Sequence, residues 1–323
     1  MNRQINNKIN KLASKQAIVL TVVVTVLLIM GSMINRRFLM PMNLANILTR
    51  AALLGFIAIG QTLVVISGNN GLDLSAGGMM SLSAILVYTV MNGRDAWFLP
   101  SLLIALSTGA VFGMFNAIGI VYAKIPALVM TLAMSNLLTS VQQLFTGGNP
   151  TGAPAPLAVR IATTKALPFL PWLTVVWIAV VILMYLFMSR TSYSRQLYAT
   201  GSNQNAAFFA GVKVNKIRVL TYTLSGILNA FAGFWLCAYN GVLYVNAGIS
   251  YVMPSVAAVV IGGTSLAGGR GNYPGTVAGA IILTMINSQL VMLDTGEAGR
   301  FIMNGIVLLA LLAVYTRGPS IRQ

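Results

Sequence analysis

Residues that could carry out chemistry are scarce in this sequence. The 323-residue chain has one cysteine, Cys237, and no histidine, and its four acidic residues are Asp73, Asp95, Asp294 and Glu297. Histidine is the commonest general base, and one thiol without histidine is a poor basis for a metal site. The sequence therefore predicts no catalytic residues, no metal site and no enzyme activity.

Asp73 is the acidic residue most readily connected with a function. It lies in the string Gly71-Leu72-Asp73-Leu74-Ser75, next to long apolar segments. An ionisable side chain near membrane depth is costly and indicates a functional site. Aspartate or serine at the start of a helix instead accepts hydrogen bonds from its free N–H groups. Both interpretations stay open: a cap for the next helix, or contact with a solute or a gating partner.

An ATP-binding motif is absent from the chain. The pattern G-x-x-x-x-G-K-[ST] does not occur, and no lysine follows a glycine. The backbone cradle and the lysine that hold nucleotide phosphates are therefore missing. We expect no cofactor in this chain, and any ATP-driven process would need ATP and Mg²⁺ on another subunit.

The composition indicates the elements that position these residues. Hydrophobic residues make up 57% of the chain and charged residues 7%, whereas soluble domains have about 25% charged residues. Runs such as Ala17–Ile34, Leu102–Val121 and Trp172–Met188 approach the roughly 20 residues that cross a bilayer. Because only a helix satisfies its own backbone in lipid, we expect an all-α polytopic membrane protein with one domain, 1–323.

Ten membrane spans are predicted. They are 17–34, 46–67, 73–91, 98–122, 126–145, 169–188, 218–240, 253–268, 274–293 and 299–316. With the N-terminus inside, this count places most lysines and arginines on the cytoplasmic side, as the positive-inside rule requires. We therefore expect both termini to be cytoplasmic, and we attribute the net charge of +16 to topology rather than to nucleic-acid binding.

Two connections between the spans are long. Residues 146–168 begin with TGGNPTGAPAP, which is too rich in glycine and proline to be helical. Residues 189–217 are polar and basic, and they include small residues around Phe208 and Phe209. This pattern is typical of a short surface helix that presses into a groove of another protein. The alternative is a solvated loop that only retains the topology.

Glycine-rich breaks occur in both halves of the chain. Residues 68–84 and 262–280 each separate two apolar segments, and each contains a leucine followed by small residues and a glycine pair. Paired interrupted segments in two related halves indicate the translocation path of a transporter. Close helix packing through small residues explains the same glycines equally well.

Four stretches of the sequence resemble the permease subunits of bacterial ABC importers for ribose, xylose, arabinose, galactose and related molecules. These stretches are 46–61, 59–78, 197–218 and 256–283, and they cover nearly the whole chain in order and spacing. The combination of GLDLS with VIGGTSLAGG is the specific part. The resemblance implies a pore in the bacterial inner membrane that carries a small neutral solute, most simply a monosaccharide.

The resemblance also implies partners and functional residues. A second permease subunit, identical or not, would complete the pore, two cytoplasmic ABC ATPases would drive it, and a soluble extracytoplasmic binding protein would deliver the solute. The segment from Asn205 to Gly211 is similar to the E-A-A-x-x-x-G pattern that docks on the ATPase. The residues expected at this coupling site are Asn205, Ala206, Ala207, Phe208 and Gly211. The residues expected to line the path, with amides and hydroxyls suited to a sugar, are Gln61, Asp73, Ser75, Asn240, Thr264 and Asn287.

Two departures from the pattern leave other solutes open. Asn69 and Asn70 precede Gly71 where sugar permeases usually have glycine, and residues 250–255 lack an acidic pair that many of them carry. Nucleosides, branched-chain amino acids or a sugar-derived signal therefore remain alternatives. A transporter driven by H⁺ or Na⁺ is a further alternative, for which Asp73 would be the only intramembrane carboxylate.

Overall fold

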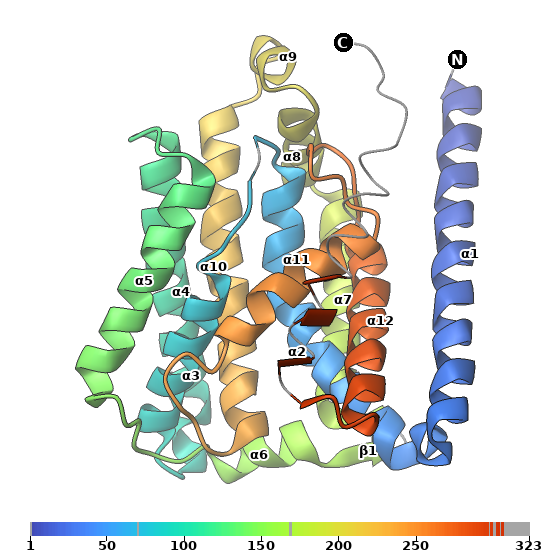
Figure 1. Cartoon of the computed structure of the whole chain (residues 1–323). Helices are drawn as coiled ribbons and strands as arrows, with labels where there is room; N and C mark the ends of the chain where they lie inside the picture. The colour runs from blue at the N-terminus through green and yellow to red at the C-terminus, as the bar shows by residue number, and fades with distance from the viewer. Residues whose placement is uncertain are drawn as a thin grey trace.

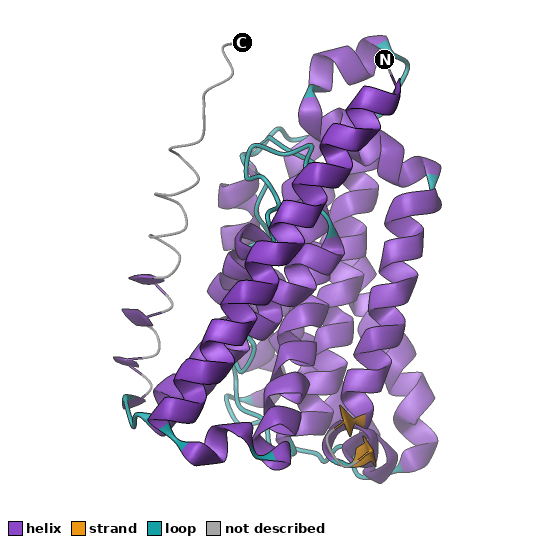
Figure 2. Cartoon of the chain, turned by 90° about the vertical axis from the view of Figure 1, so that its right-hand side faces the viewer, coloured by secondary structure: helices purple, strands orange, loops and turns teal. Residues whose placement is uncertain are grey.

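The computed structural model describes residues 2–69, 71–167, 170–296, 298–299, 302–303 and 305–306, and this part of the chain is a bundle of helices (Figure 1). The one sheet among these residues is a small antiparallel hairpin of β1 (Lys165–Leu167) and β2 (Leu170–Pro171). It lies at the end of the bundle opposite the start of α1 (Figure 2).

The helices differ greatly in length. The long ones are α1 (Asn2–Ile34), α2 (Pro41–Ile66), α4 (Phe98–Val121), α5 (Ala127–Thr146), α7 (Trp172–Arg190), α10 (Val214–Asn240) and α12 (Tyr273–Met292). The short ones are α3 (Ala76–Met91), α6 (Pro156–Thr163), α8 (Ser192–Ser202), α9 (Gln204–Phe209) and α11 (Val252–Ile261). Three 3₁₀ turns are η1 (Arg36–Leu39), η2 (Asp95–Trp97) and η3 (Ile249–Tyr251).

The helices agree with the predicted all-α polytopic fold. Six described helices are long and apolar enough to cross a membrane, and three shorter apolar helices, Ile18–Ile34, Ala76–Met91 and Ile249–Ile261, accompany them. These nine helices coincide with the first nine predicted spans, so the fold class is confirmed. The tenth predicted span, 299–316, lies mostly outside the described residues.

Several predicted boundaries are wrong. The span predicted over 253–268 is helical only to Ile261, because the chain then turns through glycines of positive φ, Gly263 (81°), Gly268 (89°) and Gly269 (67°). The span predicted from residue 73 becomes helical only at Ala76. The predicted loop 146–168 contains α6, which begins at Pro156, a residue that suits the first position of a helix.

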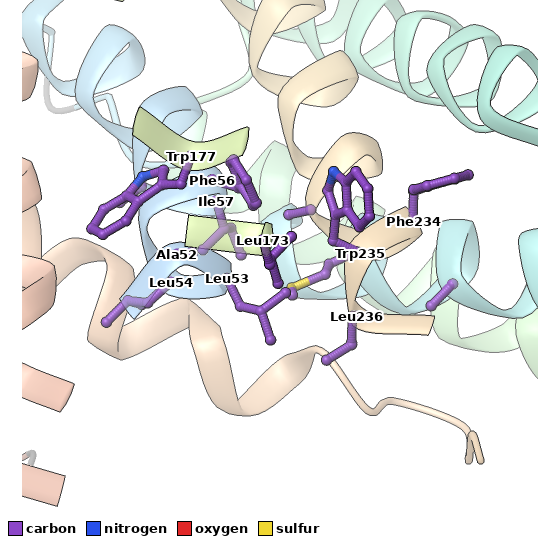
Figure 3. Close-up of a cluster of buried hydrophobic side chains, with 14 of the residues drawn as sticks. Ala52, Leu53, Leu54, Phe56, Ile57, Leu173, Trp177, Phe234, Trp235 and Leu236 are labelled. Atoms are coloured by element: carbon purple, nitrogen blue, oxygen red, sulfur yellow. The ribbon is translucent and has the colours of Figure 1, made fainter. Parts of the chain in front are cut away.

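The core surrounds α2. The apolar stretch of α2 is 94% buried, against 17% for that of α7, so α2 is the central helix and α7 is peripheral. Figure 3 shows side chains of α2, α7 and α10 gathered around Phe56 and Leu53. A buried hydrogen-bond chain joins three helices: Trp177 Nε1 donates to Tyr273 Oη (2.9 Å), and Tyr273 Oη donates to the carbonyl of Gly55 (3.0 Å).

Glycines bring α4 and α10 into backbone contact. A methyl group on Gly226 would overlap the carbonyl oxygen of Gly109 and lie 2.9 Å from Cα of Gly113. Membrane helices lack a hydrophobic drive to associate, so such close van der Waals contact is a main source of their attraction. The helix pair therefore depends on the absence of a side chain at these positions.

We expect Gly226→Ala to destabilise the protein, because backbone atoms on both sides of the new methyl group cannot move away as a flexible side chain could. Overpacking of this kind costs about 1–3 kcal/mol. Thermal unfolding of the purified protein in detergent measures the loss, with Ser107→Ala on the exposed face of α4 as the control. Equal unfolding temperatures for the two variants would contradict the contact.

Candidate functional site

Two helices of the bundle continue through a non-helical break into a shorter helix. Residues 67–75 connect α2 to α3, and residues 241–251, which include η3, connect α10 to α11. α2 and α10 run in opposite directions, and in Figure 1 each break turns back into the bundle before its short helix begins. Broken helices in two oppositely oriented units are typical of transporters that bind solute near the membrane midplane.

The counterpart of the first break differs from the expected one. The sequence suggested that 68–84 corresponds to 262–280. In the structure the segment that corresponds to 67–75 is 241–251, because each of the two joins a long helix to a short one. The two short helices meet where they begin. Ser81 Oγ on α3 accepts a hydrogen bond from the N–H of Gly248 and donates to the carbonyl of Gly77, both at 2.8 Å. A methyl group on Gly77 would lie 2.8 Å from the Gly248 carbonyl oxygen.

Asp73 is the centre of a buried hydrogen-bond network. Its Oδ1 accepts from the N–H of Ser75 (3.1 Å) and from Ser75 Oγ (2.5 Å). Its Oδ2 accepts from Ser225 Oγ (2.7 Å) and Asn229 Nδ2 (3.2 Å), both on α10. Asn116 Nδ2 on α4 donates to Ser75 Oγ at 2.8 Å. We call these five residues the Asp73 network.

The network fastens the first break to two neighbouring helices. The Asp73 side chain is 2% exposed and is held by four donors, none of them basic. Charge-assisted hydrogen bonds are the strong ones, so they compensate part of the cost of a buried carboxylate. Ser75 is the N-cap residue of α3 and makes no side-chain capping hydrogen bond, so the bond from its N–H to Asp73 shapes the segment before the helix.

The other predicted path residues are more scattered. Gln61 is fully buried on α2, and neither atom of its amide has a hydrogen-bond partner among the described residues. The preceding residue, Gly60, packs against the Asp73 network, because a methyl group on it would lie 2.7 Å from Ser225 Oγ. Gln61 therefore follows directly in the chain a residue that touches the network. Ser75 belongs to that network.

Three predicted path residues lie away from the Asp73 network. Thr264 is fully buried after α11, and its hydroxyl has no hydrogen-bond partner among the described residues. Asn240 is exposed at the end of α10. Asn287 is half-buried on α12 and donates to the carbonyl of Leu283 (3.1 Å). The structure thus brings Asp73 and Ser75 together and leaves these three apart.

The predicted coupling segment forms α9 at the tip of the molecule (Figure 1). Asn203 caps the helix by accepting from the N–H of Ala206 (3.0 Å). Asn205, Ala206 and Gly211 are exposed, whereas Ala207 is buried and fastens the helix to the bundle.

Two adjacent aromatic rings point away from the bundle at α9. Phe208 is 65% exposed and Phe209 86% exposed, with ring centroids 5.8 Å apart. Large exposed aromatics at a protein tip indicate an interaction surface. Phe209 was missing from the residues predicted for coupling, although the Phe-Phe doublet in the sequence is a signal for it.

Glycine backbones connect α8, the helix before α9, to the first break and to loop 262–272. The end of α8 lies against the end of α2 and the loop 262–272, and we call this contact the glycine junction. The N–H of Gly269 donates to the carbonyl of Ile66 (2.9 Å). A methyl group on Gly201 would overlap that same carbonyl, and one on Gly268 would lie 2.9 Å from the nitrogen of Gly68.

A tyrosine reinforces the glycine junction. Tyr198 Oη on α8 donates to the carbonyl of Gly271 at 2.6 Å. Burial raises the pKa of Tyr198 above its ordinary value, so its hydroxyl keeps the proton that this hydrogen bond needs at neutral pH. Because Asn203, the cap of α9, directly follows α8, a movement of α9 reaches the junction over a very short stretch of chain.

Comparison with known proteins agrees with this architecture. Residues 43–312 match the profile of a family described as "Branched-chain amino acid transport system / permease component". The ribose import permease protein RbsC of Bacillus subtilis (strain 168) is 33% identical over 286 residues, or 88% of each chain. RbsC of Escherichia coli (strain K12) is 31% identical over 300 residues, or 90% of each chain.

A further relative is the autoinducer 2 import system permease protein LsrC of Escherichia coli (strain K12 / DH10B). It is 33% identical over 292 residues, which cover 90% of this chain and 83% of LsrC. No solved structure matches the chain. The chain is therefore a multi-pass inner-membrane permease, and it belongs to the family of branched-chain amino acid transport system permease components.

Proposed function

We propose that this permease forms the translocation path of an ABC importer for a small neutral monosaccharide. The observation that carries the proposal is the similarity to ribose import permeases along about nine tenths of both chains. A neutral, hydroxyl-bearing solute also fits the single buried carboxylate of the Asp73 network, which is already engaged by its own donors.

The chain would act as a non-catalytic pore with separate partners. ATP and Mg²⁺ would bind to ABC ATPase subunits that dock on α9 through Phe208 and Phe209. A second permease subunit would complete the pore, and an extracytoplasmic binding protein would deliver the sugar. The N-terminus of α1 lies at the same end of the molecule as α9 (Figure 1), which supports a cytoplasmic N-terminus.

The glycine junction suggests how ATP hydrolysis moves the path. Closure of the ATPases would shift α9 and α8 as one unit. The junction would transmit that shift to the end of α2 and to loop 262–272, because backbone atoms in direct contact cannot move independently of one another. Packed interfaces of this kind switch between discrete arrangements rather than deforming continuously. The breaks would then open the path to one side at a time.

Uptake by the reconstituted transporter tests the proposal. Proteoliposomes holding the permease and its ATPase, with the binding protein outside, are supplied with labelled ribose, xylose, arabinose, galactose, autoinducer 2, leucine or adenosine. We expect ATP-dependent uptake of one neutral sugar. Uptake of leucine or adenosine alone, or uptake driven by an ion gradient without ATP, would overturn the proposal.

We predict that Asp73→Asn lowers uptake about tenfold, corresponding to the loss of one charge-assisted hydrogen bond worth roughly 1.5–3 kcal/mol. The new amide would point donor hydrogens at groups that are themselves donors, so the first break would lose its anchor. Initial uptake rates measure the effect. Asp95→Asn is the control, because Asp95 is an exposed carboxylate that accepts a backbone N–H from Leu157 (2.7 Å). Unchanged uptake in Asp73→Asn would show that the anchor is dispensable.

We predict that Gly201→Ala uncouples the transporter. The methyl group separates α8 from α2 at the glycine junction, while the exposed rings of α9 stay available to the ATPase. ATP hydrolysis and co-purification of the ATPase should persist while uptake per ATP falls by at least about tenfold, the equivalent of 1.4 kcal/mol. Gly147→Asn is the matched control, because Gly147 has open space and a φ of 60° that asparagine tolerates. Normal uptake per ATP in Gly201→Ala would refute the junction's role.

A further inference from the structure

The second half of α5 exposes several polar side chains. Only 22% of its apolar stretch is buried, so most of the helix faces outward. At about 100° per residue, the exposed residues Asn136, Ser140 and Gln143 fall within about 60° of one another. We call them the α5 polar arc. At the same helical angle the first half of α5 exposes Val129 and Leu132, so the arc is polar only in the second half of the helix. The exposed residues Ala133, Leu137 and Leu144 lie beside it, and we call them the apolar arc.

The polar arc begins at membrane depth. Asn136 stands near the middle of this 20-residue helix, which is about 30 Å long and so matches the hydrocarbon thickness. Ser140 satisfies its hydroxyl by donating to the carbonyl of Asn136 (3.1 Å). The amide side chains of Asn136 and Gln143 have no hydrogen bond to any described residue. An unsatisfied amide in hydrocarbon costs several kcal/mol, so lipid is not a suitable environment for this arc.

Other outward faces of the bundle have a different character. The exposed face of α7 carries Ile178, Ile182, Leu183 and Leu186, and that of α4 carries Leu103, Val111 and Phe115. These faces suit lipid, as does the apolar arc of α5. The contrast indicates that the polar arc, in the second half of α5, has a different environment from these faces.

The polar side of α5 borders the second break. Thr139, at the edge of the polar arc, donates to Asn246 Oδ1 (2.9 Å), and Gln142 Oε1 accepts from the N–H of Asn246 (3.1 Å). Asn246 belongs to the segment 241–251, in which Tyr244 and Ser250 are also exposed. The neighbours of the arc on α5 are therefore bonded to the second break, which belongs to the proposed path.

We propose that the α5 polar arc lines the water-filled passage and offers a hydroxyl-bearing solute successive hydrogen-bond partners. Asn136 and Gln143 each donate and accept, as a sugar hydroxyl does, and the arc extends about 10 Å along the helix. Such a row favours short, exchangeable contacts over one tight site. This inference rests on the proposed function and assigns residues to its solute path.

Thiol labelling of the assembled transporter tests the environment of the arc. The single native cysteine, Cys237, is fully buried and is replaced by alanine to give a silent background. Asn136→Cys and Gln143→Cys report on the polar arc, and Ala133→Cys and Leu137→Cys on the apolar arc. Each variant must first retain ATP hydrolysis with the partner ATPase. A membrane-impermeant methanethiosulfonate reagent is then applied, because it reacts with thiolates that form only in water.

We expect the polar-arc cysteines to react at least about tenfold faster than the apolar-arc cysteines, and the transported sugar on its binding protein to slow that reaction. Equal, slow labelling of both arcs would place the polar arc in lipid and overturn the inference. Oxidative cross-linking of Asn136→Cys between two permease subunits, without labelling, would make the arc a subunit contact and also overturn it.

A second set of variants keeps the inference separate from the proposed function. Asn136→Leu and Gln143→Leu should lower sugar uptake several-fold with ATP hydrolysis retained, whereas Ala133→Leu should leave uptake unchanged. Should the wild-type transporter carry no sugar, the labelling pattern still decides whether the arc faces water. Should it carry sugar while the leucine variants transport normally, only the assignment of the arc fails.

Discussion

The structure depends on one constraint, namely that backbone groups buried in the membrane must find hydrogen-bond partners inside the protein. A helix meets this demand by itself, but a break in a helix does not. The first break is possible because Asp73 and Ser75 bind each other through two hydrogen bonds and bind α10 and α4 through three more. One carboxylate with four donors thus allows the chain to leave the helical form at a depth where water cannot replace the lost helical hydrogen bonds.

Close backbone contact follows from the same constraint. Where two irregular segments meet, their peptide groups can bond directly only if no side chain separates them. The bond from the Gly269 N–H to the Ile66 carbonyl is of this kind. Close-packed contacts have low compressibility and transmit strain. The fold is therefore stiff at these backbone contacts, where a transporter must transmit movement, while its outer helices face lipid.

The helices could be predicted from the sequence because lipid sets their length and composition. The breaks could be located from their glycines but not described, since a positive φ at Gly263 ends a helix that hydropathy extends to residue 268. The partners of Asp73 could not be predicted, because Ser225 and Asn229 lie more than 150 residues away in the chain. Spacing reveals the period of Asn136, Ser140 and Gln143, but only packing shows that this face is exposed.

Two pairs of amide side chains in this protein differ in their surroundings. Asn116 and Asn229 each donate a hydrogen bond within a buried network, and the helix positions they occupy are fixed by it. Asn136 and Gln143 are exposed and have no partner among the described residues, so the protein gains nothing from them in this conformation. A polar group that is unsatisfied at membrane depth lowers stability. The unbonded amides of Asn136 and Gln143 on α5 are explained if water and a solute supply the missing hydrogen bonds, because these side chains then do not face lipid and the desolvation cost does not arise.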